Sequence, residues 1–433
     1  MRRMSSRDPS WEAFLSSLRH RGGSRDRDVR KKVQEILESI GNGGEKALLE
    51  WARRLDSVPE GESALELRAE EWDRAERLLA EEDRAALEIA AQRIRAFHSR
   101  CLARSWLTVD PDGCLLGQLI QPMRRVGIYV PGGKAQYPSS VLMTAIPARV
   151  AGVEEVVMCS PLSWGEPSPA VLAAARMAGV NRVFRIGGAQ AIAAMAYGVG
   201  EIPRVDKIVG PGNAYVTEAK RMVFGEVDID MLAGPSEILV VADGTVEPAL
   251  AAADMLSQAE HDEWASALLI TTSSSYAQDV EAELSRQLEA SPRQGIARAS
   301  LERFGAILLC QDLEEALGVA AEVAPEHLEL LVERPLEWLP MVKNAGAVFL
   351  GAGSPEAMGD YLAGPSHVLP TGGSARFSSP LGVEDFLRRT SVMGISRAAM
   401  RVLGPHALRM AELEGLHAHA SSLHLRLVQS RKS

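Results

Sequence analysis

The chain of 433 residues contains few cysteines and no long apolar run. Its four cysteines are scattered and form no CxxC pair, which argues against a disulfide framework and against a thiolate metal cluster. We therefore expect free thiols in a reducing compartment, and hence a cytoplasmic protein. No apolar run reaches the roughly 18 residues that suggest a membrane-spanning helix. The cysteines are Cys101, Cys114, Cys159 and Cys310.

Standard nucleotide-binding loops are also missing. The stretch VPGGKA at 130–135 fails the Walker pattern, because Ile128 stands where the first glycine belongs and Ala135 replaces the Ser or Thr that would hold Mg²⁺. GPGNAY at 210–215 begins like a dinucleotide fingerprint but ends in Tyr215 instead of glycine. A dinucleotide bound by this chain would therefore not use the standard Rossmann loop.

The charge balance is acidic, with a formal net charge of -10, which argues against nucleic acid and anionic membranes as partners. The first 28 residues are basic and polar and lack the apolar core of a secretory signal. Acidic residues among them also count against an organelle transit peptide. We expect residues 1–28 to form a solvated N-terminal arm, and we expect a chain of this length to contain two or more domains.

The pattern along the chain predicts an α/β protein. Residues 29–103 have helical spacing of apolar positions, whereas from Arg125 short apolar runs alternate with alanine-rich helical segments. Such alternation predicts parallel sheets in two Rossmann-like lobes, at about 125–238 and 239–381. Residues 386–433 look helical and too short to fold alone, so they should pack on their own chain or on a partner. The predicted strands are VGIYV, EVVMC, VFRIG, KIVGP, EILVVAD, ALLITT, AILLC, LELLV and AVFLG.

Two short motifs carry chemistry-bearing side chains. In SQAEHD at 257–262, Gln258 and His261 are three residues apart and share one helix face, as in a metal site or a helix cap. In APEHLEL at 324–330, Glu326 and His327 are adjacent at the start of a strand-like run, so they project in different directions and could form an acid/base pair. Taken alone, each motif favours the ordinary interpretation, a helix cap or polar surface at 257–262 and a surface Glu-His pair at 326–327.

Two further segments add possible ligands. The stretch at 359–386 is long, rich in glycine and proline, and almost without helix or strand pattern, which is typical of a functional loop; its candidate ligands are Asp360 and His367. EGLHAHA at 414–420 contains Glu414 and His419. Carboxylate, amide and imidazole groups without a thiolate suit a mixed nitrogen and oxygen site for a divalent metal. The residues alone therefore indicate a metal-assisted enzyme with a loop-built site, and no more.

Longer motifs carry a family resemblance. RVGIYVPGGKAQYPSSVLMTAIPARVAG, GGAQAIAA, KIVGPGNAYVTEAKR, DMLAGPSEILVVAD, SQAEHD, APEHLEL, the loop from Gly359 and EGLHAH resemble the histidinol dehydrogenase family in order and spacing, over about residues 30 to 420. The resemblance implies a homodimer with two incomplete Rossmann-like lobes and a helical tail exchanged between subunits. It also implies one Zn²⁺ per subunit and NAD⁺ as cofactor.

The resemblance assigns roles by motif. The implied metal ligands are Gln258, His261, Asp360 and, from the other subunit, His419. The implied NAD contacts are Tyr129, Gln190 and Asn213. The implied catalytic pair is Glu326 and His327, and these two join the metal ligands and Ser236, His367 and Glu414 in contacting substrate. The implied domains are an arm at 1–28, a main lobe at 29–124 plus 239–385 with the metal and catalytic residues, a second lobe at 125–238 with the NAD contacts, and an exchanged tail at 386–433.

The activity that the resemblance implies is the oxidation of L-histidinol to L-histidine by NAD⁺ in two steps, through bound histidinal, as the final step of histidine biosynthesis. The zinc ion would hold the amino and imidazole nitrogens of histidinol, His327 would accept the proton in both steps, and Glu326 would activate the water that adds to the aldehyde. Two alternatives stay open: a paralogous zinc and NAD dehydrogenase for another polar alcohol, and an inactive homologue that serves as a binding protein. The presence of Ser236, His367 and Glu414 favours histidinol.

Overall fold

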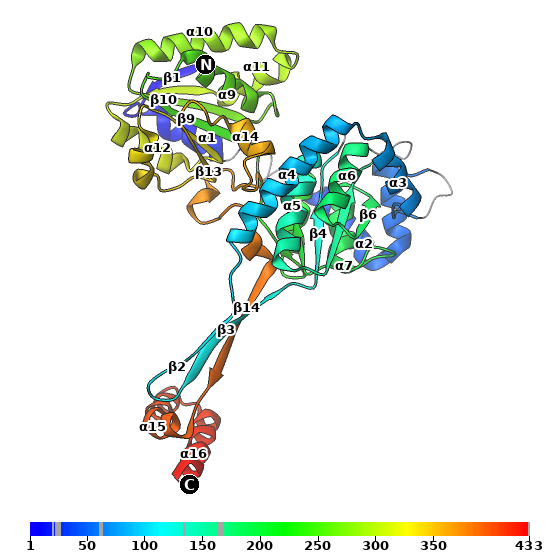
Figure 1. Ribbon diagram of the computed structural model, residues 1–433, viewed down its shortest axis with the longest axis vertical. Helices are drawn as coiled ribbons and strands as arrows, with labels where there is room; N and C mark the ends of the chain where they lie inside the picture. Colours follow the sequence, from blue (N-terminus) through cyan, green and yellow to red (C-terminus); the bar gives the residue numbers. More distant parts are fainter. Residues whose placement is uncertain (20, 22–26, 60–63, 133–135, 163–167, 432–433) are drawn as a thin grey trace. The chain divides into compact units, whose positions relative to one another are not determined.

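The computed structural model describes residues 1–19, 21, 27–59, 64–132, 136–162 and 168–431 (Figure 1). Residues 133–135, part of the glycine-rich stretch discussed above, therefore lie outside the description. The chain divides into two compact units: Met1–Cys101 with Arg124–Phe386, and Leu102–Met123 with Leu387–Ser433. Among the described helices, none combines the length and apolarity needed to span a bilayer.

A six-stranded parallel sheet forms one half of the first unit, in the order β1-β11-β10-β9-β12-β13. Its strands are β1 (Arg2–Ser5), β9 (Glu237–Ala242), β10 (Ser266–Thr271), β11 (Ala306–Leu309), β12 (His327–Leu331) and β13 (Ala347–Leu350). Alternate side chains bury on opposite faces. Ile238 and Val240 pack with helices α9 (Pro248–Ala259), α10 (Ser274–Ala290) and α11 (Gln294–Phe304). Leu239 and Val241 pack with α1 (Ser10–Arg19) and α12 (Leu313–Val323), which explains the continuous apolar runs.

The N-terminal residues differ from the solvated arm that the sequence suggested. Arg2–Ser5 pair with β11 as an edge strand, and α1 buries Trp11, Phe14, Leu15 and Leu18 against the sheet. These four positions follow the spacing of one helix face, so a narrow apolar stripe outweighs the basic residues around it. The polar composition of the segment hid this stripe.

A five-stranded parallel sheet forms the other half, in the order β6-β5-β4-β7-β8. Its strands are β4 (Arg125–Tyr129), β5 (Glu155–Ser160), β6 (Arg182–Arg185), β7 (Lys207–Val209) and β8 (Asp228–Ile229). One face packs with α2 (Arg27–Leu55), α7 (Gly188–Tyr197) and α8 (Ala214–Val223). Helix α5 (Pro138–Ala151) contacts β4 and β5 and packs with α4 (Glu81–Arg100) and α6 (Pro169–Ala178), which in turn contacts α3 (Ala69–Leu78).

Two parallel sheets flanked by helices confirm the predicted α/β class, and every apolar run predicted as a strand contains one. The predicted helices at 29–103 are α2, α3 and α4. The family resemblance implied that residues 29–124 belong with residues 239–385 in the main lobe, but α2 packs on the other half of the unit. The apolar stripe of α2, including Ile36 and Ile40, packs with Phe184 and Ile192 of the five-stranded half.

The second unit is built on an antiparallel sheet of order β14-β3-β2, with β2 (Trp106–Val109), β3 (Leu115–Pro122) and β14 (Leu387–Gly394). Helices α15 (Arg397–Leu413) and α16 (His417–Arg431) follow and pack against each other. The tail was predicted to be helical from residue 386, but its first part is a strand. The β-branched Thr390 and Val392 favour this extended form, and β3 satisfies its backbone groups. Exchange of this unit between subunits stays a prediction.

Acidification should destabilise the first unit through His98 of α4. This imidazole is 2% exposed, and neither ring nitrogen has a hydrogen-bond partner among the described residues. Burial lowers the pKa of His98 to about 4. Because the pKa of histidine in the unfolded chain is near 6.5, its stabilisation is complete above that pH and falls as the pH drops toward 4. Between pH 7 and pH 5 the loss is about 2 kcal/mol.

Replacing His98 by Leu removes this titration. Urea unfolding, followed by circular dichroism at pH 7 and pH 5, should show a smaller loss of stability for His98→Leu than for the unchanged protein. His406→Leu, at an exposed histidine, serves as the matched control and should behave like the unchanged protein. An equal loss in all three proteins would contradict the assignment to His98.

Candidate active site

The predicted catalytic residues and three of the four predicted metal ligands, Gln258, His261 and Asp360, gather at the amino-terminal edge of the six-stranded sheet. His327 opens β12 and pairs in register with Ile238 near the start of β9. Helix α9 connects β9 to the parallel strand β10, so it starts beyond the carboxyl end of β9 and runs back toward the amino-terminal edge. Its last turn brings Gln258 to this edge. Helix α14 (Glu356–Tyr361) follows β13 and brings Asp360 to this edge.

The imidazole of His327 is held in one tautomer. Its Nδ1 lies 2.9 Å from the carbonyl oxygen of Glu237, and because a carbonyl only accepts, Nδ1 carries the proton. Nε2 is buried and has no hydrogen-bond partner among the described residues. Burial lowers the pKa of His327 to about 4, so the ring is neutral at pH 7. A neutral ring with a free Nε2 can accept a proton from a bound molecule.

The carboxylate of Glu326 is fixed by the same residue of β9. The backbone N–H of Glu237 donates to Oε2 of Glu326 at 2.9 Å. That oxygen lies 3.8 Å from Nδ1 of His327, on the side of the ring away from Nε2. Burial raises the pKa of Glu326 well above its usual range. The carboxylate of Glu326 and the Nε2 atom of His327 therefore lie in different places, as the adjacent positions of the two residues in the sequence suggested.

Three further side chains converge beside this pair. His261, Glu356 and Asp360 each offer a ligand atom, and these atoms all lie within 4.8 Å of one another. Gln258 is completely buried next to them. When its amide nitrogen faces Glu356 Oε1 and Glu237 O, both at 3.2 Å, it donates to these two oxygens and lies 3.1 Å from His327 Nδ1, and the amide oxygen is left for another partner.

Glu356 was not identified from the sequence. It is 1% exposed and lies 3.5 Å, through Oε1, from Nδ1 of His327. The available signal was its position four residues before Asp360, which places both side chains on one face of a short helix. The loop was predicted to begin at Gly359, almost without helix or strand pattern. The structure corrects this, because α14 continues through Gly359 and Asp360 to Tyr361.

The donor set fits a divalent cation that accepts nitrogen and oxygen ligands. One imidazole, one amide oxygen and one or two carboxylates match the preferences of zinc for His, Asp and Glu, completed by oxygen donors. Burial raises the pKa of Glu356 well above its usual range, and the charges of Asp360 and Glu326 raise this pKa further. A cation here would relieve this crowding of carboxyl groups. Within the part of the chain described, no cysteine joins the cluster.

His367 connects the loop to the five-stranded half of the first unit. Its Nδ1 donates to the carbonyl oxygen of Asp360 at 3.0 Å, and its Nε2 accepts from the Ser140 hydroxyl at 3.2 Å. Ser236 lies one residue before β9, and its carbonyl oxygen accepts from Ser266 N at 3.1 Å. Both residues thus lie in the same unit as the catalytic pair.

Glu414 and His419 belong to the second compact unit. Glu414 caps the carboxyl end of α15, His419 lies in the first turn of α16, and both side chains are exposed. Their predicted roles toward metal and substrate therefore remain predictions that involve a second chain.

The predicted NAD contacts lie at the carboxyl edge of the five-stranded sheet. Strand order reverses at β4, and ligands of such sheets commonly bind beside this point. Tyr129 ends β4, and its hydroxyl accepts from Gly188 N, the first residue of α7, at 3.1 Å. Gln190 donates to Asp56 at 2.7 Å, and its buried Oε1 has no partner among the described residues. Asn213 caps α8 by accepting from the N–H groups of the next turn.

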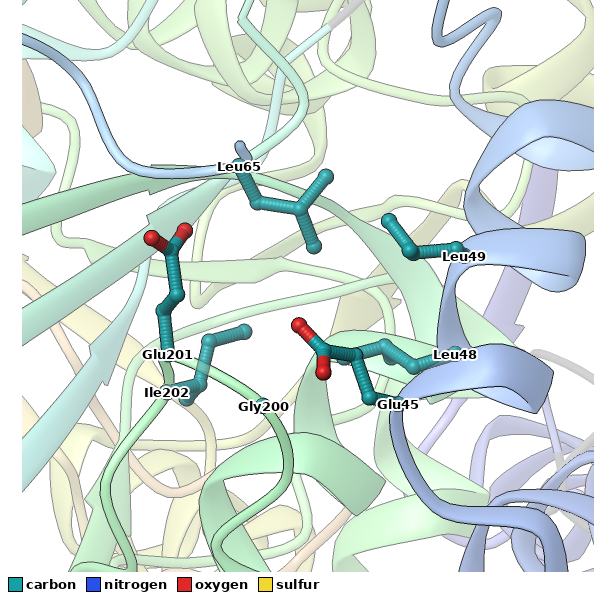
Figure 2. A pocket seen from close by; sticks show the side chains of 7 residues that line it. All are labelled: Glu45, Leu48, Leu49, Leu65, Gly200, Glu201 and Ile202. Carbon is teal, nitrogen blue, oxygen red and sulfur yellow. The ribbon is translucent and has the colours of Figure 1, made fainter. Parts of the chain in front are cut away.

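A hollow of the five-stranded half is lined by other residues (Figure 2). Leu48 and Leu49 of α2 line it together with Leu65 and Ile202, and the carboxylates of Glu45 and Glu201 extend beside it. The predicted site residues do not line it. Leucine side chains with two carboxylates offer no specific chemistry, so we assign it no role.

Comparison with known proteins identifies the family. The histidinol dehydrogenase family model matches residues 19–427. The histidinol dehydrogenase of Syntrophotalea carbinolica is 53% identical over 430 residues, which covers 99% of this chain and 100% of the relative. That of Geobacter sulfurreducens is 50% identical over 428 residues, with 99% and 100% covered. The crystal structure of histidinol dehydrogenase from Elizabethkingia anophelis matches with a TM-score of 0.94 at 33% identity, covering 100% of this chain and 99% of that one. The chain therefore belongs to the histidinol dehydrogenase family.

Proposed function

We propose that this protein oxidises L-histidinol to L-histidine with two molecules of NAD⁺, through bound histidinal, as the last step of histidine biosynthesis. Identity of about half of the residues over the full chain with named histidinol dehydrogenases supports the substrate. The observation that carries the chemistry is the catalytic pair: His327 offers a free Nε2, and Glu326 lies beside it with a raised pKa. Free, mostly buried cysteines are consistent with a cytoplasmic location.

A zinc ion would be held by Gln258, His261 and Asp360 of one chain and by His419 of the partner subunit. When bound, zinc supplies a fixed point for the amino and imidazole nitrogens of the substrate, and NAD⁺ supplies the hydride acceptor. Glu356 lies within reach of the same ligand atoms. The nucleotide would lie at the carboxyl edge of the five-stranded sheet, near Tyr129, Gln190 and Asn213.

The protein residues divide the proton transfers. His327 Nε2 accepts the proton of the substrate hydroxyl, while Nδ1–H remains bonded to the Glu237 carbonyl, which stabilises the resulting imidazolium. In the second oxidation, Glu326 accepts a proton from the water that adds to the aldehyde. Burial helps here, since a carboxylate with a raised pKa is a stronger base near neutral pH. The protonated His327 returns its first proton to the aldehyde oxygen, which completes the gem-diol, and then accepts the proton of a gem-diol hydroxyl as the second hydride leaves.

The second unit would be covered by another copy of the chain in a homodimer. Its exposed apolar side chains are numerous, and a monomer would leave them in water. They include Trp106, Leu107 and Val109 of β2 and Val402, Met410, Leu413, Leu416 and Leu425 of the helical tail. A dimer that exchanges this unit would also bring Glu414 and His419 to the partner's site.

Chelation should abolish activity without unfolding the protein. The proposed ion holds the substrate, whereas both sheets have apolar cores that do not involve it. NADH release with L-histidinol is measured before dialysis against a chelator, after dialysis, and after addition of Zn²⁺, with circular dichroism at each stage. Activity should fall to background and return with Zn²⁺ while the spectrum stays unchanged. Full activity in protein verified to be free of metal would refute the metal role.

A further inference from the structure

Glu237 contacts the proposed catalytic pair through its backbone and the loop that carries His367 through its carboxylate. Its N–H holds Glu326 and its carbonyl oxygen holds His327, both at 2.9 Å. Its carboxylate accepts from the N–H of Gly372, in the loop that also carries His367, at 2.8 Å. The residue is 5% exposed at the start of β9. It therefore joins the catalytic pair to the active-site loop.

The charge of Glu237 is balanced by Arg21, a buried residue that follows α1. The Nη2 group of Arg21 donates to Glu237 Oε1, and its Nε donates to the Leu18 carbonyl at 3.0 Å. The guanidinium carbon lies 5.5 Å from the centre of the Phe304 ring. Because α1 packs on the same sheet as β9 (Figure 1), this cation reaches the active site from a segment distant in sequence.

The two members of this pair act on Glu326 in opposite directions. Burial raises the pKa of Glu326, the N–H of Glu237 opposes this, the charges of Glu237 and Asp360 raise the pKa further, and Arg21 lowers it. The charged and titratable groups around Glu326 come from the segment after α1, from β9, from β12 and from α14: they are Arg21, Glu237, His327, Glu356 and Asp360.

We propose that Arg21 and Glu237 form a positioning pair that holds the loop at Gly372 against β9 and sets the electrostatic field at the Glu326 carboxylate. The pair touches neither substrate nor cofactor and acts through Glu326 and His327. This inference rests on the proposed function, in which Glu326 activates water. It gives the N-terminal segment a part in the second oxidation.

A structural role and an electrostatic role predict different results. If the pair only maintained the fold, removing either member would lower activity in the same way. In the proposed role, Glu237→Gln leaves the Arg21 cation unbalanced and lowers the pKa of Glu326, while Arg21→Met leaves an unbalanced anion and raises it. The double variant carries neither charge, so the two effects cancel.

The experiment measures kcat/KM for histidinal oxidation between pH 5 and pH 9. The acid limb of this profile reports the ionisation of Glu326. We expect Glu237→Gln to move the limb down and Arg21→Met to move it up, each by about half a pH unit or more, with the double variant near the original position. Displacement of both single variants in one direction, or loss of activity without displacement, would overturn the proposal.

A conservative variant tests separately whether the Glu237 carboxylate holds the loop at Gly372 in place. Glu237→Asp keeps the charge but withdraws the carboxylate from Gly372 by one methylene group. Its acid limb should stay in place while kcat for histidinal falls about fivefold or more with little change in KM. An unchanged kcat would refute the positioning role. If Glu237→Gln or Arg21→Met fails to fold, the result for Glu237→Asp alone supports or refutes the proposal.

Two controls separate this proposal from the proposed function. Arg3 of the edge strand β1 and Glu281 of α10 form an ion pair away from the predicted catalytic residues, so Arg3→Met and Glu281→Gln should leave the profile unchanged. Glu326→Gln should remove the acid limb along with the activity toward histidinal. If Glu326→Gln keeps that activity, the assigned role of Glu326 fails; if it loses the activity but the pair variants shift nothing, the positioning pair fails.

Discussion

His327→Asn should lose activity in both oxidation steps, by about 10²- to 10⁴-fold, whereas Glu326→Gln should lose it only in the second. Asparagine cannot accept the proton that Nε2 of His327 takes from each hydroxyl. Glutamine at position 326 still accepts from the Glu237 N–H, so the local fold stays, but it no longer deprotonates water. The two buried side chains are therefore expected to have separable chemical tasks.

Each variant is assayed with histidinol and with histidinal in separate reactions, following NADH by stopped flow. The first NADH formed per active site from histidinol, before bound histidinal is oxidised, reports the alcohol step. Glu333→Gln, at an exposed glutamate just past the other end of β12, is the matched control and should keep both activities. Equal losses for both substrates in Glu326→Gln and in His327→Asn would refute this division of labour.

Most of the predicted strands could be recognised because their residues are buried on both faces of a sheet. Runs such as EILVVAD have no polar alternation, and in the structure Ile238 and Leu239 pack against opposite helical layers. The N-terminal strand and helix were not predictable in this way. Arg2–Ser5 is an edge strand with an exposed, charged sequence, and only its pairing with β11 makes it a strand.

The site was predictable as a set of residue types, but not as a geometry. Motif resemblance named Gln258, His261, Asp360 and the catalytic pair, and the structure brings these side chains to one sheet edge. It did not name Glu356, whose burial beside the ligands depends on how α14 packs. Nor could the sequence identify Glu237 as the residue that holds both catalytic side chains, since it does so through backbone groups.

Mixed dimers provide a quantitative test of the shared site. His261 lies in the first unit and His419 in the second, so an exchanged tail would place them on different chains of each site. His261→Asn and His419→Asn should each be inactive alone, because every site then lacks one metal ligand. In a heterodimer of the two, one site carries both substitutions and the other carries neither. Random mixing makes about half of the dimers heterodimers, so recovered activity should approach about a quarter of the unmutated level.

A tail that folds back on its own chain gives a different count. Every site in the mixture would then carry one substitution, and activity would stay at the level of the inactive parents. The two variants are given different affinity tags, dissociated, and reassociated, and the doubly tagged dimer is isolated before the assay. That purified heterodimer should have about half of the unmutated activity and about one tightly bound zinc ion per dimer instead of two. Verified heterodimers without recovered activity or bound zinc would rule out a site shared between subunits, because exchange leaves one complete ligand set in each of them.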